Sequence, residues 1–192
     1  PPVAGTFTVG CFREAGDRGN NNETLHEVTL SPYRVAKVAV TLGDLRRFGM
    51  AGRETHPWKD EEPAIKVSWY EATAYAAWRG ARLPTEAEWE VAARGGGGVY
   101  FKTGYATGNT DADADRCAWH AGNSGRDTHY AADPKPGAPV HPLGLLHMQG
   151  NVLQWCRDWY APYPESASTD PSGPLTAPPS AGRVMRGGSW AN

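Results

Sequence analysis

The sequence predicts one loop-rich domain that begins with strands and continues with helices. The 192 residues include 23 Gly and 16 Pro, about a fifth of the chain against a usual eighth or so. Eight Trp and eight Tyr supply far more aromatic surface than a disordered chain carries. Hydrophobic periodicity is strand-like near the N-terminus and helical in the middle, and it fades afterwards. The length suits one domain of roughly 100 to 200 residues.

The first forty residues predict two or three strands. Apolar and polar positions alternate around Phe7 and Val9, and again around Val28 and Leu30. A polar insert rich in Gly and Asn, residues 14–23, separates the two runs. We therefore expect strands that are joined by a surface loop.

The middle of the chain predicts three helices, because three capping boxes occur there. In each box a Ser or Thr precedes an acidic residue by three positions, so that each side chain can satisfy a free backbone amide of the first turn. The pairs are Thr41 with Asp44, Ser68 with Glu71, and Thr85 with Glu88. Gly49, Gly80 and Gly95 stand near the expected helix ends.

Beyond Gly95 the sequence predicts mostly ordered loops. Gly, Asn, Asp and Pro dominate up to about residue 182, interrupted by one apolar stretch at 151–160. So much irregular chain in a domain has to pack against something, and such loops often carry function. The closing segment 183–190 predicts a strand that bends at its glycines.

Charge and composition exclude several classes of function. The formal net charge of −2 gives no electrostatic reason to expect nucleic acid or an anionic membrane as a partner. No apolar run approaches the 18 or so residues that span a bilayer, so we expect no membrane insertion. Cys11, Cys117 and Cys156 form no CxxC motif and fix no disulfide framework. The first residue, Pro1, suggests that a preceding segment was removed.

Two candidate metal sites are weak. The histidines at 120, 129, 141 and 147 lie close in sequence, but their spacing matches no ligand pattern, so ordinary hydrogen-bonded histidines are favoured. Residues 111–115 begin like a calcium loop, yet Arg116 stands where that loop has Gly and Gly122 where it has Glu. We expect a solvated turn there.

Seven segments in order along the chain resemble the formylglycine-generating enzyme family, also called sulfatase-modifying factors. They are 7–10, 38–48, 67–72, 82–96, 144–152, 155–160 and 183–190. The run Arg82-Leu-Pro-Thr-Glu-Ala-Glu-Trp-Glu is the most specific of them. The resemblance implies an α+β fold of the C-type-lectin-like class over residues 1–192, with a chain that stops before the end of the domain.

The resemblance also bears on catalysis. The founding enzymes of this family oxidise a sulfatase cysteine to formylglycine, using two copper-binding cysteines that follow a Gly-Gly-Ser-aromatic stretch. The first of these aligns with Asn192, and the second would lie beyond the last residue. An amide cannot replace a thiolate as a ligand of monovalent copper. We therefore assign no catalytic residue, expect no copper, and lean against an enzyme.

A calcium site of the family also looks degenerate. The resemblance places its ligands at His147, Gly150, Val152 and Gln154, where Gly150 and Val152 offer only backbone carbonyls. Calcium prefers several hard oxygens with charge from carboxylates, which His147 and Gln154 do not supply. We expect direct hydrogen bonds at this position and no cofactor in the protein.

Other family members are variable proteins of diversity-generating retroelements, in which the fold is a stable frame for a diversified binding surface. Segment 183–192 resembles the start of that surface, with Asn192 at a typical first variable position. This implies a non-catalytic module that binds a protein or another macromolecule, with Arg186, Trp190 and Asn192 at the edge of the surface. A cysteine oxidase or another oxygen-using enzyme is the alternative, and an adhesion domain without diversification is a third. The sequence assigns no cellular compartment.

The family motifs also indicate which role to expect for the tryptophans. Five of them lie in the matching segments and are expected to pack in the core, because a loop-rich domain needs buried aromatic area. They are Trp69, Trp78, Trp89, Trp155 and Trp159. Trp190 borders the expected binding surface, so core packing and ligand contact are about equally expected for it.

Overall fold

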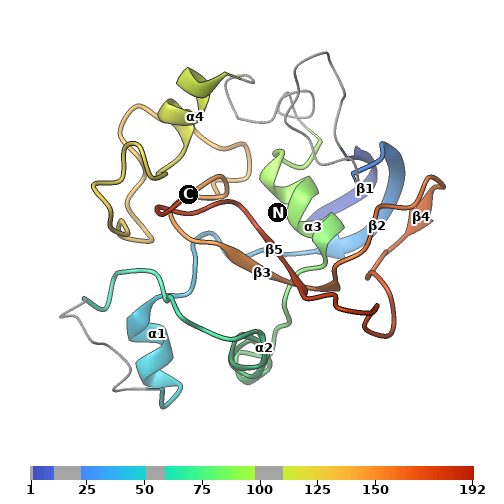
Figure 1. Ribbon diagram of the computed structural model, residues 1–192, viewed down its shortest axis with the longest axis horizontal. Coiled ribbons are helices and arrows are strands. Elements are labelled where there is room, and N and C mark those ends of the chain that lie inside the picture. The colour runs from blue at the N-terminus through green and yellow to red at the C-terminus, as the bar shows by residue number, and fades with distance from the viewer. Residues whose placement is uncertain (1, 11–22, 51–58, 98–109) are drawn as a thin grey trace.

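Two small sheets form the β part of the protein, whose computed structural model describes residues 2–10, 23–50, 59–97 and 110–192 (Figure 1). Strand β1 (Val3–Val9) pairs antiparallel with β2 (His26–Tyr33), and β4 (Ser168–Thr169) adds in parallel to β2. Strand β3 (Gln154–Trp159) pairs antiparallel with β5 (Arg183–Arg186). Of the two or three strands expected before residue 40, the described residues contain two, β1 and β2, and most of the insert 14–23 lies outside the described residues.

The three expected helices are confirmed together with their caps. They are α1 (Leu42–Arg47), α2 (Trp69–Trp78) and α3 (Glu86–Ala93). In each, the Ser or Thr side chain accepts from the backbone N–H three residues on, and the acidic side chain there accepts from the cap's own N–H. These contacts are local, which explains why sequence spacing alone locates the helices.

A fourth helix, α4 (Asp111–Cys117), corrects the expectation of a solvated turn at residues 111–115. Thr110 and Asp113 form another capping box, and the acidic first turn faces the positive end of the helix dipole. The other described residues after Gly95, at 96–97 and 110–192, are mostly turns and loops, as expected, apart from α4, β3, β4 and β5.

Helix α3 connects the two sheets, since it contacts β1, β2, β3 and β5. One side of it, including Val91, joins an apolar cluster with residues of β1 and β2. The other side, including Trp89, joins a second cluster with Leu145, Cys156 and Val184. Because α3 is buried on both sides, it is the element that fixes the relative placement of the two sheets.

The five tryptophans divide in their burial. Trp89 is 6% exposed and lies in the core, as expected. Trp69, Trp155 and Trp159 are partly buried. The expectation is wrong for Trp78, which is 54% exposed and lies against the rings of Phe48 and Tyr75.

The predicted bend after β5 is confirmed at Gly187 and Gly188, whose φ angles are +100° and +72°. A Cβ at Gly187 would stand 3.1 Å from the carbonyl oxygen of Met148, so backbone strain and close approach both favour glycine there. The bend directs residues 187–192, which we call the C-terminal turn, away from the strand. In the described part of the chain no helix is long and apolar enough to cross a membrane.

Candidate ligand-binding face and its support

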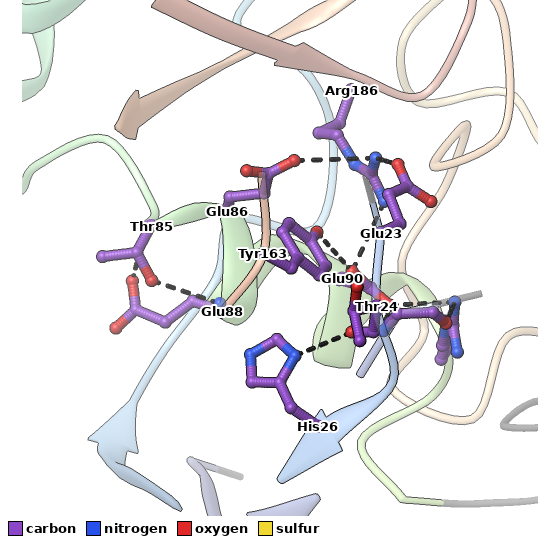
Figure 2. Close-up of polar contacts among 11 residues, drawn as sticks. Glu23, Thr24, His26, Thr85, Glu86, Glu88, Glu90, Tyr163 and Arg186 are labelled. Atoms are coloured by element: carbon purple, nitrogen blue, oxygen red, sulfur yellow. Dashed lines mark hydrogen bonds and ion pairs between the residues drawn. The ribbon is translucent and has the colours of Figure 1, made fainter. Parts of the chain in front are cut away.

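Arg186, one of the three expected ligand contacts, lies in a cluster of ions beside α3 (Figure 2). Its guanidinium stands 2.5 Å from Glu23 Oε1, 3.6 Å from Glu86 Oε1 and 3.5 Å from Glu90 Oε2. Its side chain is 19% exposed, whereas that of Glu90 is 2% exposed. The charge of Arg186 is therefore already neutralised inside the protein.

Glu90 is the most buried acid of this cluster and has several donors. Gly10 N–H donates to its Oε1 at 2.8 Å, the Tyr163 hydroxyl donates to its Oε2 at 2.7 Å, and Arg94 lies 2.8 Å from Oε1. A buried carboxylate is tolerated only with such compensation. The cluster thus ties β1, α3 and β5 together through one side chain.

Glu86 of this cluster, and Asp158, whose Oδ2 accepts from Glu86 N–H, have raised pKa values. Burial, reinforced by Asp158, Glu90 and Glu23, raises the pKa of Glu86 to about 7 even though Arg186 opposes the shift. Burial likewise raises the pKa of Asp158 to about 6. Burial by itself would lower the pKa of Arg186, but the surrounding acids raise it, so this residue stays charged throughout the physiological range.

We expect the free energy of unfolding to fall as the pH rises from about 4.5 to about 7, because Glu86 binds its proton more tightly in the folded chain than in the unfolded one. The Glu86→Gln variant imitates the protonated form. It should match the parent at pH 5 and exceed its stability at pH 8 by about 2 kcal/mol. Urea unfolding from pH 5 to pH 8 measures this, with the exposed Glu165→Gln as control. Equal pH profiles for parent and Glu86→Gln would contradict the assignment.

Asn151 organises the second part of the site, around the C-terminal turn. Its side chain is fully buried, with Oδ1 accepting from His129 N–H and Nδ2 donating to the His129 carbonyl, both at 2.8 Å. Its backbone N–H donates to the Trp119 carbonyl, and its own carbonyl accepts from Trp190 N–H, both at 2.8 Å. One residue therefore joins three segments that are far apart in sequence.

The segment that supports the turn is built from stacked side chains. The rings of Trp119 and His129 lie parallel with their centroids 3.5 Å apart, and Lys135 Nζ lies 4.1 Å from the Trp119 centroid. His129 Nε2 is 3.0 Å from the Ser124 carbonyl. Both faces of Trp119 are thus covered, so this ring supports the site and offers no free face for stacking a ligand.

Trp190 and Asn192 are brought together on this support. Ser124 Oγ donates to the Trp190 carbonyl at 3.0 Å, and Ala121 N–H donates to the Asn192 carbonyl at 3.2 Å. Trp190 is partly buried and Asn192 is exposed. The structure therefore joins two of the three expected contacts in one face, while Arg186 is held in the ion cluster.

The degenerate calcium position is bridged by direct hydrogen bonds. Gln154 Oε1 accepts from Trp89 Nε1 at 2.9 Å, and its Nε2 donates to the His147 carbonyl at 3.1 Å. His147 Nε2 lies 2.8 Å from the Asp133 carbonyl. The one side-chain oxygen available here is already used, so these residues do not fit a calcium ion.

The histidines and cysteines that could serve as metal ligands are held by contacts within the protein. Every one of the four histidines between 120 and 147 has a hydrogen-bond partner for its ring, as expected. Within the described ranges, no three His, Cys, Asp or Glu side chains are grouped as a metal site. Cys156 is fully buried, and burial raises the pKa of its thiol; Cys11 lies outside the described residues. Asn192 offers an amide in place of a thiolate, so the described residues do not fit the two-cysteine copper site that the resemblance implies.

Sequence reasoning missed Asn151, Trp119 and His129 as parts of the site. A signal for Asn151 is present, since Asn tolerates the left-handed backbone that it adopts here, with a φ of +71°. No spacing pattern indicates Trp119 or His129, because the stacking of their rings and their hydrogen bonds to Asn151 form only in the folded chain.

Comparison with known proteins places these features in a family. The model of the sulfatase-modifying factor enzyme 1-like domain matches residues 3–192. The formylglycine-generating enzyme of Streptomyces coelicolor is 42% identical over 153 residues, which cover 75% of this chain and 45% of that protein. A mouse protein named inactive C-alpha-formylglycine-generating enzyme 2 is 36% identical over 139 residues, or 69% of this chain and 39% of that one.

A solved structure is similar over nearly the full chain. Treponema denticola variable protein 1 superposes with a TM-score of 0.75 at 27% identity, covering 99% of this chain and 82% of that one. The chain spans less than half the length of the two curated relatives.

Proposed function

The chain belongs to the formylglycine-generating enzyme, or sulfatase-modifying factor, family with its C-type-lectin-like fold, and we propose that it is a non-catalytic module for binding a macromolecular ligand. The ligand would contact the C-terminal turn, residues 187–192, chiefly through the side chains of Trp190 and Asn192. The observation that carries this proposal is Asn192, an amide where the family resemblance places a copper-binding thiolate. The likeness to a variable protein supports it.

The hydrogen bonding of the turn suits a surface whose side chains vary. Trp190 is held through its backbone N–H and carbonyl, by Asn151 and Ser124. Asn192 is held through its backbone by Ala121 and Ser189, with one further side-chain bond to Ser189. Because these hydrogen bonds are made mainly to backbone atoms, the side chains at 190 and 192 can change while the hydrogen bonds that hold the turn remain. A ligand would then be selected by those side chains, as in an antibody loop.

This arrangement predicts that the turn tolerates substitution. Trp190→Ser and Asn192→Ser should each lower the free energy of unfolding by about 1 kcal/mol or less. A display library randomised at positions 190 and 192 should retain folded members and yield binders to an unrelated test protein such as lysozyme. Folded libraries without any binder, or a loss of folding at most substitutions, would contradict the proposal.

The alternative is a cysteine oxidase, which the 42% identity to a formylglycine-generating enzyme favours. Incubating the full-length protein with copper and a Cys-x-Pro-x-Arg peptide separates the two functions. We expect no formylglycine by mass spectrometry. Its formation would overturn the non-catalytic assignment whatever the library shows.

A further inference from the structure

A cavity whose lining includes Lys135, the residue that covers the Trp119 ring, combines apolar and positively charged side chains that the proposed function does not use. Its volume is about 290 Å³, at the small end of ligand pockets. Apolar side chains dominate its lining, among them Leu145, Leu146 and Met148. Lys135, which also covers the Trp119 ring, contributes to the wall.

The charged side chains that line this cavity all have one sign. Lys37 and Lys135 line it, and the lining contains no Asp or Glu. Within the described part of the chain, neither lysine forms an ion pair with a carboxylate. Two positive charges therefore border an apolar wall without a negative counterpart.

The two histidines of the lining add no charge near neutral pH. Leu143 N–H donates to His141 Nδ1, so that nitrogen accepts and Nε2 carries the proton toward the Ala93 carbonyl, 3.1 Å away. Burial lowers the pKa of His141 and that of His147. The positive charge thus comes from the lysines alone, at the edge of a neutral pocket.

We propose that this cavity binds a small amphipathic carboxylate, with an apolar body of about six carbons against the wall and the carboxylate beside the lysines. The volume limits the size of the body, and the apolar lining favours a hydrocarbon over a sugar or nucleotide. The two lysines favour an anion over a neutral compound of equal size, and with no acid in the lining a cation is disfavoured. This site is separate from the ligand contacts at 190 and 192.

Three probes of equal length test the proposal: hexanoate, hexan-1-ol and hexylammonium, each titrated into the full protein at constant ionic strength. Chemical shifts in ¹H–¹⁵N spectra should move saturably around Leu145 and Leu146 with hexanoate, with a Kd on the order of 1 mM. Hexanol should bind about fivefold more weakly, and hexylammonium at least about tenfold more weakly. Equal binding of hexanol and hexanoate, or shifts elsewhere in the protein, would overturn the proposal.

Two variants report on charge without disturbing the core. Lys37→Gln should weaken hexanoate about fivefold and leave hexanol unchanged, while the exposed Lys66→Gln serves as the matched control. Val140 lines the cavity and is 89% exposed, so a negative charge can be placed there to reverse the expected preference for an anion. In Val140→Asp, hexylammonium should gain affinity as hexanoate loses it. If hexanoate affinity is the same in the parent and both cavity variants, the lysines do not recognise the ligand and the proposal fails.

Discussion

Replacing Arg186 by Met is expected to lower the free energy of unfolding by about 3–5 kcal/mol. The change removes the guanidinium beside Glu86 and leaves Glu90, which is 2% exposed, with Arg94 as its remaining positive partner, whereas the apolar chain of Met fills part of the volume. Removing one member of a buried ion cluster costs far more than the net value of the pair, because the other charge remains desolvated. Chemical unfolding of parent and variant at pH 8 measures the loss.

Arg183 provides the matched comparison, since it lies at the other end of β5. Its guanidinium stacks between Trp69 and Trp159, at 3.8 Å and 3.6 Å from their ring centroids. Arg183→Met should cost about 1 kcal/mol through lost cation–π contacts. Equal losses for the two variants would show that the carboxylates near Arg186 are not the cause. A further test is the double change Arg186→Met with Glu86→Gln, which should recover part of the stability because it removes the carboxylate that Arg186 faced.

The second large effect is expected for Asn151→Ala, which should cost about 2–4 kcal/mol. The change leaves the backbone N–H and carbonyl of His129 without their partner and places Ala at a φ of +71°, which Asn tolerates better. Amide hydrogen exchange at His129 and Trp190 should accelerate, because the three joined segments separate. This variant links the support of the turn directly to the proposed binding face.

Two milder variants separate the contributions at position 151. Asn151→Gly keeps the backbone freedom but loses both side-chain hydrogen bonds, and Asn151→Asp keeps the acceptor for His129 N–H but loses the donor. We expect Asp to retain more protection of the His129 amide than Gly does. If all three variants exchange at the parent rate, Asn151 does not hold the segments together.

The helices show how far local patterns predict this fold. Four helices begin with a Thr or Ser and an acidic residue three positions on, and three of these pairs predicted their helices correctly. The fourth pair, Thr110 and Asp113, overlaps an acidic run that also resembles the start of a calcium loop. Its capping contacts involve neighbours only, so the sequence carries the signal for this helix as well.

Arg186 shows the opposite case. It was expected at the edge of the binding surface because it precedes the Gly-Gly-Ser-Trp stretch, yet its side chain lies among carboxylates of α3 and Glu23. Glu86 and Glu90 are four residues apart and so share one face of α3, which indicates an acidic stripe. Which basic side chain faces that stripe depends on the position of β5 against α3, and no spacing in the sequence reports it.

The sequence by itself determined the family, helices α1, α2 and α3, the bend at Gly187 and the amide at position 192, because each of these depends on neighbouring residues or on a residue type at a known place in a motif. The tertiary structure alone decided that Arg186 is neutralised in the interior, that Asn151 holds Trp119, His129 and Trp190 together, and that two lysines border a cavity without acids. The physical reason is that burial and charge compensation arise from contacts between distant segments, and these exist only once the sheets have packed on α3.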